Sequence, residues 1–376
     1  MAVTELDEYM AHQAVATFDQ MPNTDPQWTE RVWFSAFDKS GGHQLVFGFG
    51  KYQNRNVMDG SIGLVVNHSV QYNVRASREL SPALDTYRIG PLGYEIVEPL
   101  RIVRVLAEGN ESGFSCDVRF IGETEIYEQT PPMFRRRKGR TINHMIRYFQ
   151  TGSLEGWIEV EGERREVKRD EWWAARDRSW GLRSNTGERT SPSGESASEL
   201  GGLEPPGEGV AYRWNFFTMQ FDEWNTSFEF AQTPDGHRLG PALGHLQYAA
   251  HLERPPQKIV HVNHEWDFTP GTERLRGIHS VIHLDDGTVK EIDMEPVSVA
   301  FRRPGGGHYG GHKDWVQGVW MGGQRVEGDR IELTDDVIAD LHNVEDYALK
   351  VRCGDAQGWG VAEPMIPGIA ELLTTD

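Results

Sequence analysis

The chain has 376 residues, which is more than one ordinary hydrophobic core accommodates, so two domains are expected. Its formal net charge of −19 argues against a nucleic-acid partner, because phosphate binding needs clustered Lys and Arg. The N-terminus has no basic stretch followed by an apolar one, and no apolar run is long enough for a transmembrane helix, so a cytoplasmic protein is expected.

The composition favours an all-β protein with aromatic cores or cavities. The chain contains 12 Trp, 16 Phe and 11 Tyr, and its 41 Gly suit many tight turns. The two cysteines, Cys116 and Cys353, have neither metal nor redox spacing, and Cys116 lies in an apolar run where a buried reduced thiol is expected.

The first half predicts one helix and then strands. Residues 6–20 are the best helix candidate, and the residues from Pro131 to Arg140 read as a loop. A hairpin is expected from Leu154 to Val167, with its tight turn at Glu161-Gly162. The other predicted strands are residues 31–37, 44–49, 62–76, 94–106 and 114–121, of which 62–76 would have to curve or bulge.

A composition change after Gly181 marks a domain boundary. Residues 184–209 consist of Ser, Gly, Glu, Thr and Pro with almost no apolar residue, which is typical of an exposed linker. The second half then repeats the β pattern in residues 211–221, 226–232, 277–284, 288–294, 315–320, 324–333, 347–352 and 358–365, with a short helix at 334–341 capped by Thr334. The expected domains are residues 1–183 and 210–376.

The middle of the chain resembles the hydroxyneurosporene synthase-like, or carotenoid hydratase-like, proteins. The resemblance lies in the run from Arg147 to Val167 and in Asp177-Arg178-Ser179-Trp180-Gly181, where Arg178 stands at a position that is commonly His. Weaker similarity covers residues 33–54, 90–100 and 358–363. The resemblance implies two tandem lipocalin-like, calycin-type antiparallel β-barrels with a short N-terminal helix, and chemistry on apolar molecules by hydratases, cyclases or isomerases.

Asp177 is the first candidate catalytic residue. Its carboxyl lies between Arg176 and Arg178 in the sequence and near several indoles, so it is a candidate general acid or base. The alternative is a structural ion pair that fixes the end of a strand. The substrate-binding candidates around it are Trp173, Trp180, Arg176 and Arg178.

His144 and Tyr148 are the next candidates, because alternation places both on one face of a strand as an acid–base pair. A satisfied structural histidine is the alternative reading. Tyr52 and Asn54 follow a strand and are candidates for binding a substrate oxygen, although a hairpin turn explains them equally well. The resemblance places Glu363 inside the second barrel, where a carboxylate is functional or paired.

The histidines of the second half do not form a recognised metal site. His279 and His283 share a face of a predicted strand but lie about 13 Å apart, too far to bind one ion. His308 and His312 lie in a Gly-rich stretch that is interpreted as a flexible flap, with neither the lysine nor the helix of a phosphate loop. Neither a metal nor another cofactor is expected.

Two classes of function follow. The first is a cofactor-independent lyase, hydratase or isomerase that acts by general acid–base catalysis on a hydrophobic small molecule, either a phenolic, lignin-derived type of compound or an isoprenoid. The second is a non-catalytic lipocalin-like protein that binds an apolar ligand. A homodimer is compatible with both.

Overall fold

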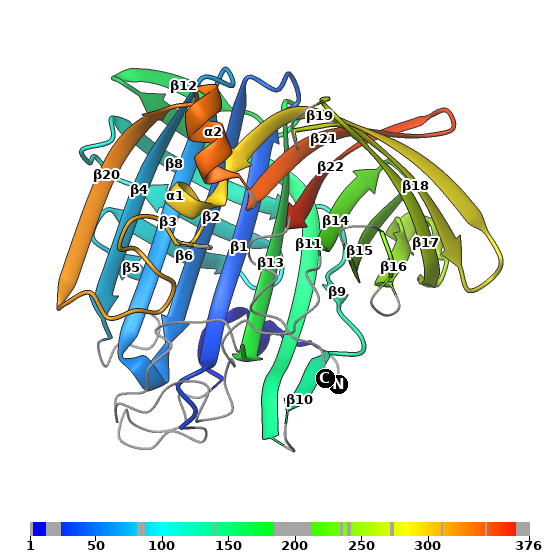
Figure 1. Ribbon diagram of the computed structural model, residues 1–376, viewed down its shortest axis with the longest axis horizontal. Helices are drawn as coiled ribbons and strands as arrows, with labels where there is room; N and C mark the ends of the chain where they lie inside the picture. Colours follow the sequence, from blue (N-terminus) through cyan, green and yellow to red (C-terminus); the bar gives the residue numbers. More distant parts are fainter. Residues whose placement is uncertain are drawn as a thin grey trace.

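A computed structural model of the protein describes residues 3–12, 24–80, 87–137, 140–183, 213–233, 236–238, 242–270, 274–309, 311–342 and 344–365. Two antiparallel sheets lie side by side, one of 14 strands and one closed barrel of eight (Figure 1). The predicted all-β fold of two tandem lipocalin-like barrels is confirmed. No described helix is long and apolar enough to cross a membrane.

The 14-stranded sheet, called the first barrel below, has the order β20-β4-β3-β2-β1-β13-β11-β8-β7-β6-β5, and β9, β10 and β12 pair with β11. Its strands are β1 (Trp28–Asp38), β2 (His43–Tyr52), β3 (Val57–Val66), β4 (Val70–Glu79), β5 (Arg88–Ile89), β6 (Leu92–Glu98), β7 (Ile102–Ala107), β8 (Phe114–Gly122), β9 (Tyr127–Glu128), β10 (Met133–Arg137), β11 (Arg140–Val160), β12 (Glu163–Val167), β13 (Trp172–Leu182) and β20 (Gln324–Glu332).

The second barrel closes in the order β14-β15-β16-β17-β18-β19-β21-β22. Its strands are β14 (Arg213–Phe221), β15 (Trp224–Gln232), β16 (Leu243–Tyr248), β17 (Gln257–Phe268), β18 (Leu275–Leu284), β19 (Val289–Phe301), β21 (Glu345–Cys353) and β22 (Ala356–Met365). The helical turns are η1 (Glu5–Glu8), η2 (Gln53–Arg55), η3 (Ala250–Leu252), α1 (Arg302–Gly305) and α2 (Asp335–Leu341).

Several predicted elements are confirmed and others are corrected. The hairpin turn at Glu161-Gly162 and the helix capped by Thr334 are present. The predicted strand over 62–76 is wrong, because Asn67 and His68 adopt positive φ and turn the chain between β3 and β4. Residues 131–140 contain β10 rather than a loop, and 315–320 contain no strand. Within residues 6–12 of the helix predicted over 6–20, the structure has only the 3-10 turn η1, and residues 13–23 and 184–212 lie outside the described part.

The two faces of β1 and β13 serve different cores. Val32 and Phe34 point into the first barrel and join its large apolar cluster. The alternate residues Trp33 and Phe37 point to the second barrel, where Phe216 belongs to their cluster. Because successive strand residues face opposite sides, one strand contributes side chains both to the interior of the first barrel and to the junction of the two barrels.

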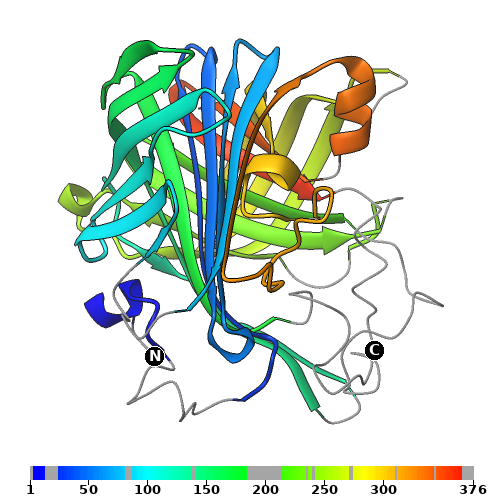
Figure 2. The same ribbon diagram turned by 90° about the vertical axis from the view of Figure 1, so that its left-hand side faces the viewer.

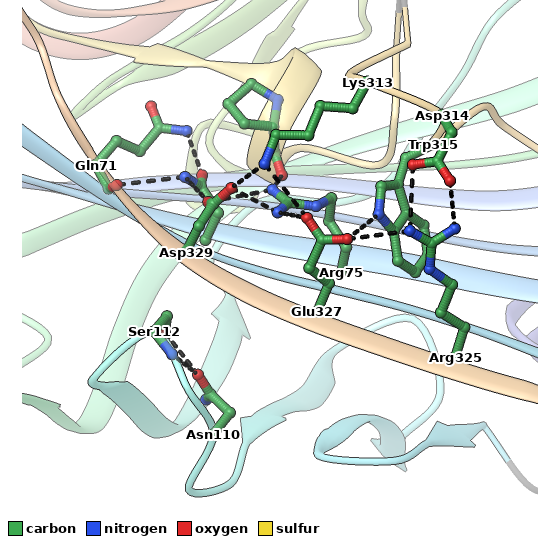
Figure 3. A network of polar contacts seen from close by, with 12 residues as sticks. Gln71, Arg75, Asn110, Ser112, Lys313, Asp314, Trp315, Arg325, Glu327 and Asp329 are labelled. Atoms are coloured by element: carbon green, nitrogen blue, oxygen red, sulfur yellow. Dashed lines mark hydrogen bonds and ion pairs between the residues drawn. The ribbon is translucent and has the colours of Figure 1, made fainter.

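Strand β20 comes from the second half of the chain but pairs with β4 at the edge of the first barrel (Figure 2). Figure 3 shows the ion pairs that hold it. The Arg75 side chain is fully buried, and its Nη2 lies 2.9 Å from Glu327 Oε1 and 2.6 Å from Asp329 Oδ2. Trp315 Nε1 donates to Glu327 Oε2 at 2.9 Å. A division of the chain at residues 184–209 therefore leaves β20 on the other side of the boundary from its own sheet.

The segment after α1 packs tightly on β2, since glycines face each other there. A Cβ added at Gly48 would lie 2.5 Å from Gly307 Cα, closer than real contacts allow. We expect Gly48→Ala to lower the free energy of unfolding by about 1–3 kcal/mol, the usual effect of overpacking, as measured by urea denaturation. Gly109→Ala is the control, because its added Cβ would meet nothing within 4 Å. Equal stability of the two variants would contradict the tight contact.

Candidate active site at the junction of the barrels

Asp177 lies on the face of β13 that points to the second barrel. Its register partners are Trp33 on β1 and Phe149 on β11, so a ring flanks the carboxyl on each neighbouring strand. The residue is 9% exposed, and Arg147 Nη1 lies 4.0 Å from its Oδ2. Arg176 and Arg178, its neighbours in sequence, point to the opposite face. The cations that act on Asp177 therefore come from other elements.

The surroundings of Asp177 raise the pKa of its carboxyl towards neutral pH. Burial raises its pKa above the ordinary value, and guanidinium groups oppose that shift only in part. These groups belong to Arg147, Arg183, Arg302 and Arg31. A carboxyl with a raised pKa can accept and release a proton near neutral pH more readily than a surface aspartate.

Glu363 and Asp346 form a second acidic group at the junction. Burial raises the pKa of both carboxyls. The charges of Asp346 and Asp177 raise the pKa of Glu363 further, whereas a hydrogen bond with Glu363 lowers that of Asp346. Arg302 Nη1 lies 2.6 Å from Glu363 Oε2 and 3.5 Å from Asp346 Oδ1. Trp33 Nε1 donates to Asp346 Oδ2 at 3.0 Å. The structure thus brings Glu363, a predicted binding residue, to the electrostatic neighbourhood of Asp177.

Tyr309 completes the cluster, and the sequence reading missed it. Arg183 Nη1 donates to its hydroxyl at 3.0 Å, and the guanidinium carbons of Arg302 and Arg31 lie 4.0 Å and 5.0 Å from its ring centroid. Burial alone would raise the pKa of the phenol, but these three cations lower it to about 8. No sequence motif singles out a tyrosine within a Gly-rich stretch, so spatial convergence of the arginines is the signal that identifies it.

The pKa of Tyr309 can be measured without a substrate. We expect a difference titration near 295 nm, the absorbance of tyrosinate, to show one phenol of the 11 ionising with a pKa of about 8, roughly two pH units below an ordinary tyrosine. Tyr309→Phe should remove that step. Tyr72→Phe is the control, because the pKa of Tyr72 is raised. A step that persists in Tyr309→Phe would contradict the assignment.

Aromatic side chains from both barrels surround the cluster. The Phe149 and Phe216 rings stack with their centroids 4.8 Å apart, and Trp214 stacks on Phe216 at 5.8 Å. The guanidinium carbon of Arg147 lies 4.6 Å from the centroid of Phe149, and Arg147 is ion-paired with Glu229. The rings provide apolar surface beside these titratable groups. Trp173, another predicted binding residue, packs on Phe37 in the same junction core.

Four predicted site residues lie instead inside the first barrel. Arg176 is ion-paired with Glu8 at 2.7 Å, and Arg178 with Glu30 at 2.6 Å. Tyr148 is fully buried and lies near Arg176, whose guanidinium carbon is 5.8 Å from the tyrosine ring centroid. Trp180 stacks on His12 with a centroid distance of 4.1 Å. Alternation along β13 separates Arg176, Arg178 and Trp180 from Asp177, and Tyr148 on β11 is the register partner of Arg178.

The remaining predicted residues lie apart from Asp177. His144 is exposed and makes an edge contact with Phe134. Asn54 lies in η2, where its Nδ2 donates to the backbone oxygen of Asp25 at 2.8 Å. The Tyr52 hydroxyl donates to Asp59 Oδ1 at 3.2 Å. Tyr52 also contacts Arg31, which is one of the cations near Tyr309 and Asp177.

The described part of the Gly-rich stretch, interpreted from the sequence as a flexible flap, is largely packed. His308 is 1% exposed and stacks on Trp315 with a centroid distance of 5.3 Å. Burial lowers the pKa of His308 to about 3. Within the described part of the chain, no three His, Cys, Asp or Glu side chains are arranged to hold a metal ion.

Comparisons with known proteins identify a family and a fold. A model of the family of unknown function DUF8625 matches residues 3–371. No curated protein sequence matches the chain. A crystal structure assigned as AttH from Nitrosomonas europaea is similar, with 12% identity, a TM-score of 0.51 and coverage of 90% of this chain and 92% of that one.

Two further solved structures are similar over nearly their full length. Kievitone hydratase from Nectria haematococca has 10% identity and a TM-score of 0.49, covering 95% of each chain. CghA with Sch210972 has 10% identity and a TM-score of 0.45, covering 96% of this chain and 97% of that one. The likeness to the AttH structure shows the fold alone, and the resemblance to carotenoid hydratase-like proteins stays a prediction.

Proposed function

Because the chain belongs to the family of unknown function DUF8625, whose description assigns no reaction, we propose a function from the junction itself. The protein is an enzyme that adds, removes or relocates the elements of water, or an equivalent group, on a hydrophobic small molecule by general acid–base catalysis. The substrate is a phenolic or isoprenoid compound that lies against the aromatic rings between the barrels.

Asp177 is the proposed base and Tyr309 the proposed acid. In the elimination direction, Asp177 takes a proton from a substrate carbon, electrons move to form the double bond, and Tyr309 gives a proton to the departing hydroxyl so that water leaves. Addition of water reverses these steps. Arg183 and Arg302 favour negative charge that develops on the phenol oxygen or on a substrate oxygen.

The observation that carries this proposal is the hydrogen bond from Arg183 to Tyr309 beside Asp177. Arg183 also acts electrostatically on the Asp177 carboxyl, so its charge acts on both groups. The pKa of the phenol is lowered and that of the buried carboxyl is raised, which shifts the two values towards neutral pH from opposite sides. Such paired displacement is typical of acid–base sites, since each group must change protonation state during turnover.

The pH dependence follows from the signs of these shifts. Asp177 acts as a base when ionised, so kcat/KM should rise with pH through its raised pKa. Tyr309 acts as an acid when protonated, so kcat/KM should fall above a pKa of about 8. We expect a bell-shaped profile whose alkaline limb is lost in Tyr309→Phe. A limb that stays in Tyr309→Phe and disappears in Glu363→Gln would assign the acid to Glu363 instead.

The experiment that tests the proposal is a ligand screen followed by product analysis. Thermal shifts would be measured against phenolic dimers, terpenoids, carotenoids, steroids and fatty acids, because a ligand at 100 times its Kd adds about 2.7 kcal/mol of stability. Each hit would be incubated with wild type and its products examined by mass spectrometry for gain or loss of one water, or loss of formaldehyde. Binding without conversion of any hit would favour a binding protein over an enzyme.

A further inference from the structure

Residues 8–10 of the N-terminal segment reach into the end of the first barrel, whereas residues 4–6 are exposed. Glu8 and Met10 are completely buried. The segment belongs to no strand of the described structure, and side chains of the barrel hold its backbone. Met10 N donates to the Tyr87 hydroxyl at 3.0 Å, and Lys51 Nζ donates to the Met10 oxygen at 3.2 Å. The segment is held as a bound peptide would be.

The Glu8 carboxylate receives hydrogen bonds from three separate parts of the barrel. Arg176 on β13 donates from Nη1 at 2.7 Å and from Nη2 at 2.9 Å, in bidentate geometry. The backbone N–H of Leu100 donates at 2.7 Å and the Tyr94 hydroxyl at 3.2 Å. Every donor belongs to the barrel, and the N-terminal segment supplies the carboxylate.

These donors are fixed by contacts that do not involve Glu8. Gln150 Oε1 accepts from Arg176 Nε at 3.0 Å and from Nη2 at 2.8 Å. The Tyr94 ring stacks near Phe47 in the apolar core. Leu100 has φ of 60°, a region that side chains disfavour, and its carbonyl accepts from Gln150 at 2.7 Å. A strained residue held by its surroundings is a common feature of ligand sites.

The carboxylate site opens onto apolar surface. Met10, two residues from Glu8, belongs to the large hydrophobic cluster of the first barrel, together with Phe49, Tyr87 and Tyr94. Burial would raise the pKa of Glu8, but the Arg176 charge and the hydrogen bonds lower it overall, so the bound group is a carboxylate. The site therefore combines donors for an acid head group with an apolar lining, which the Met10 side chain contacts.

We propose that the interior of the first barrel is a binding site for a carboxylic acid with an apolar tail, and that Glu8 to Met10 of the chain occupy this site in cis. The Glu8 carboxylate stands in for the ligand head group and the Met10 side chain for its tail. The site is separate from the junction, since Arg176 and Asp177 face opposite sides of β13, and the proposal does not depend on the proposed reaction.

Competition with the tethered segment sets the expected affinities. A segment tethered in cis competes at an effective concentration in the millimolar range, so wild type should bind a free acid weakly. Glu8→Gln removes the competing charge but keeps the length of the side chain. We expect its Kd for decanoate, measured by calorimetry on the full chain, to be at least tenfold lower than that of wild type. Decanol, which has no carboxylate, should bind this variant poorly.

Two control variants and one measurement on wild type decide the result. Glu5→Gln, at an exposed position of the same turn, should bind like wild type, and Arg176→Met added to Glu8→Gln should abolish decanoate binding. Excess decanoate should also speed amide hydrogen exchange of residues 9–12 in wild type, a readout that does not depend on how the variants fold. Equal Kd in wild type and Glu8→Gln, equal binding of decanol, or unchanged exchange would each overturn the proposal.

Discussion

Asp177→Asn is expected to lower kcat by about 10²–10⁴-fold, the usual contribution of a positioned general base. Asn has nearly the same shape but cannot accept the proton at the buried carboxyl oxygen, so binding of the ligand should persist. The measurement is turnover of a compound that the thermal-shift screen identifies, together with its thermal shift on the variant. A large loss of kcat with a retained shift separates catalysis from binding.

The matched control is Asp170→Asn, which removes an exposed carboxyl near the start of the same strand. It should leave kcat within experimental error of wild type. If Asp177→Asn keeps full turnover, Asp177 is a structural ion-pair residue and the base lies elsewhere. If Asp177→Asn loses both turnover and the thermal shift, the carboxyl serves binding, and the assignment of a base is wrong.

Arg75→Met is expected to lower the free energy of unfolding by about 3 kcal/mol, at the lower end of the range for removing one partner of a buried ion pair. The arginine is fully buried, whereas the side chains of Glu327 and Asp329 are 27% and 22% exposed, so water relieves part of the loss. The two carboxylates would repel each other at the β4–β20 edge, and the strand should loosen. Urea denaturation gives the free energy, and hydrogen exchange of β20 shows whether the strand opens first.

Arg101→Met is the control for this substitution. Its guanidinium is ion-paired with Glu98, but the side chains are 60% and 47% exposed, and such surface pairs contribute about 1 kcal/mol or less. A similar loss in both variants would show that the buried network is no stronger than a surface pair. Rapid exchange throughout β20 in wild type would show that the strand is not held by Arg75 at all.

The sequence allowed the fold class to be predicted but not the pairing of every strand. Alternation and turn residues identified most strands, because those signals are local. The position of β20 could not be read, since its partner β4 is about 250 residues away and nothing local encodes that pairing. The turn at Asn67-His68 was not predicted, because it lies within a long valine-rich run and two non-glycine residues adopt positive φ there.

The site was predictable only in part, because local sequence signals do not show which distant residues meet in the folded chain. Asp177 stood out because it lies among cations and indoles, yet adjacency in sequence places Arg176 and Arg178 on the other side of a strand. The cations that do act on it come from β1, β11, α1 and the end of β13, and Tyr309 from the segment after α1. Only the folded chain brings these elements together, so the acid and most of the arginines required the structure.

The most direct test of the proposed proton transfer is deuterium exchange into a bound ligand. A compound that shifts the melting temperature would be incubated in D₂O with wild type and with Asp177→Asn. The compound would then be recovered and its mass measured by mass spectrometry. Wild type should place deuterium on a substrate carbon or in the product, and Asp177→Asn should not, although both bind the compound. Equal exchange in the two proteins, or no exchange in wild type despite binding, would contradict the account.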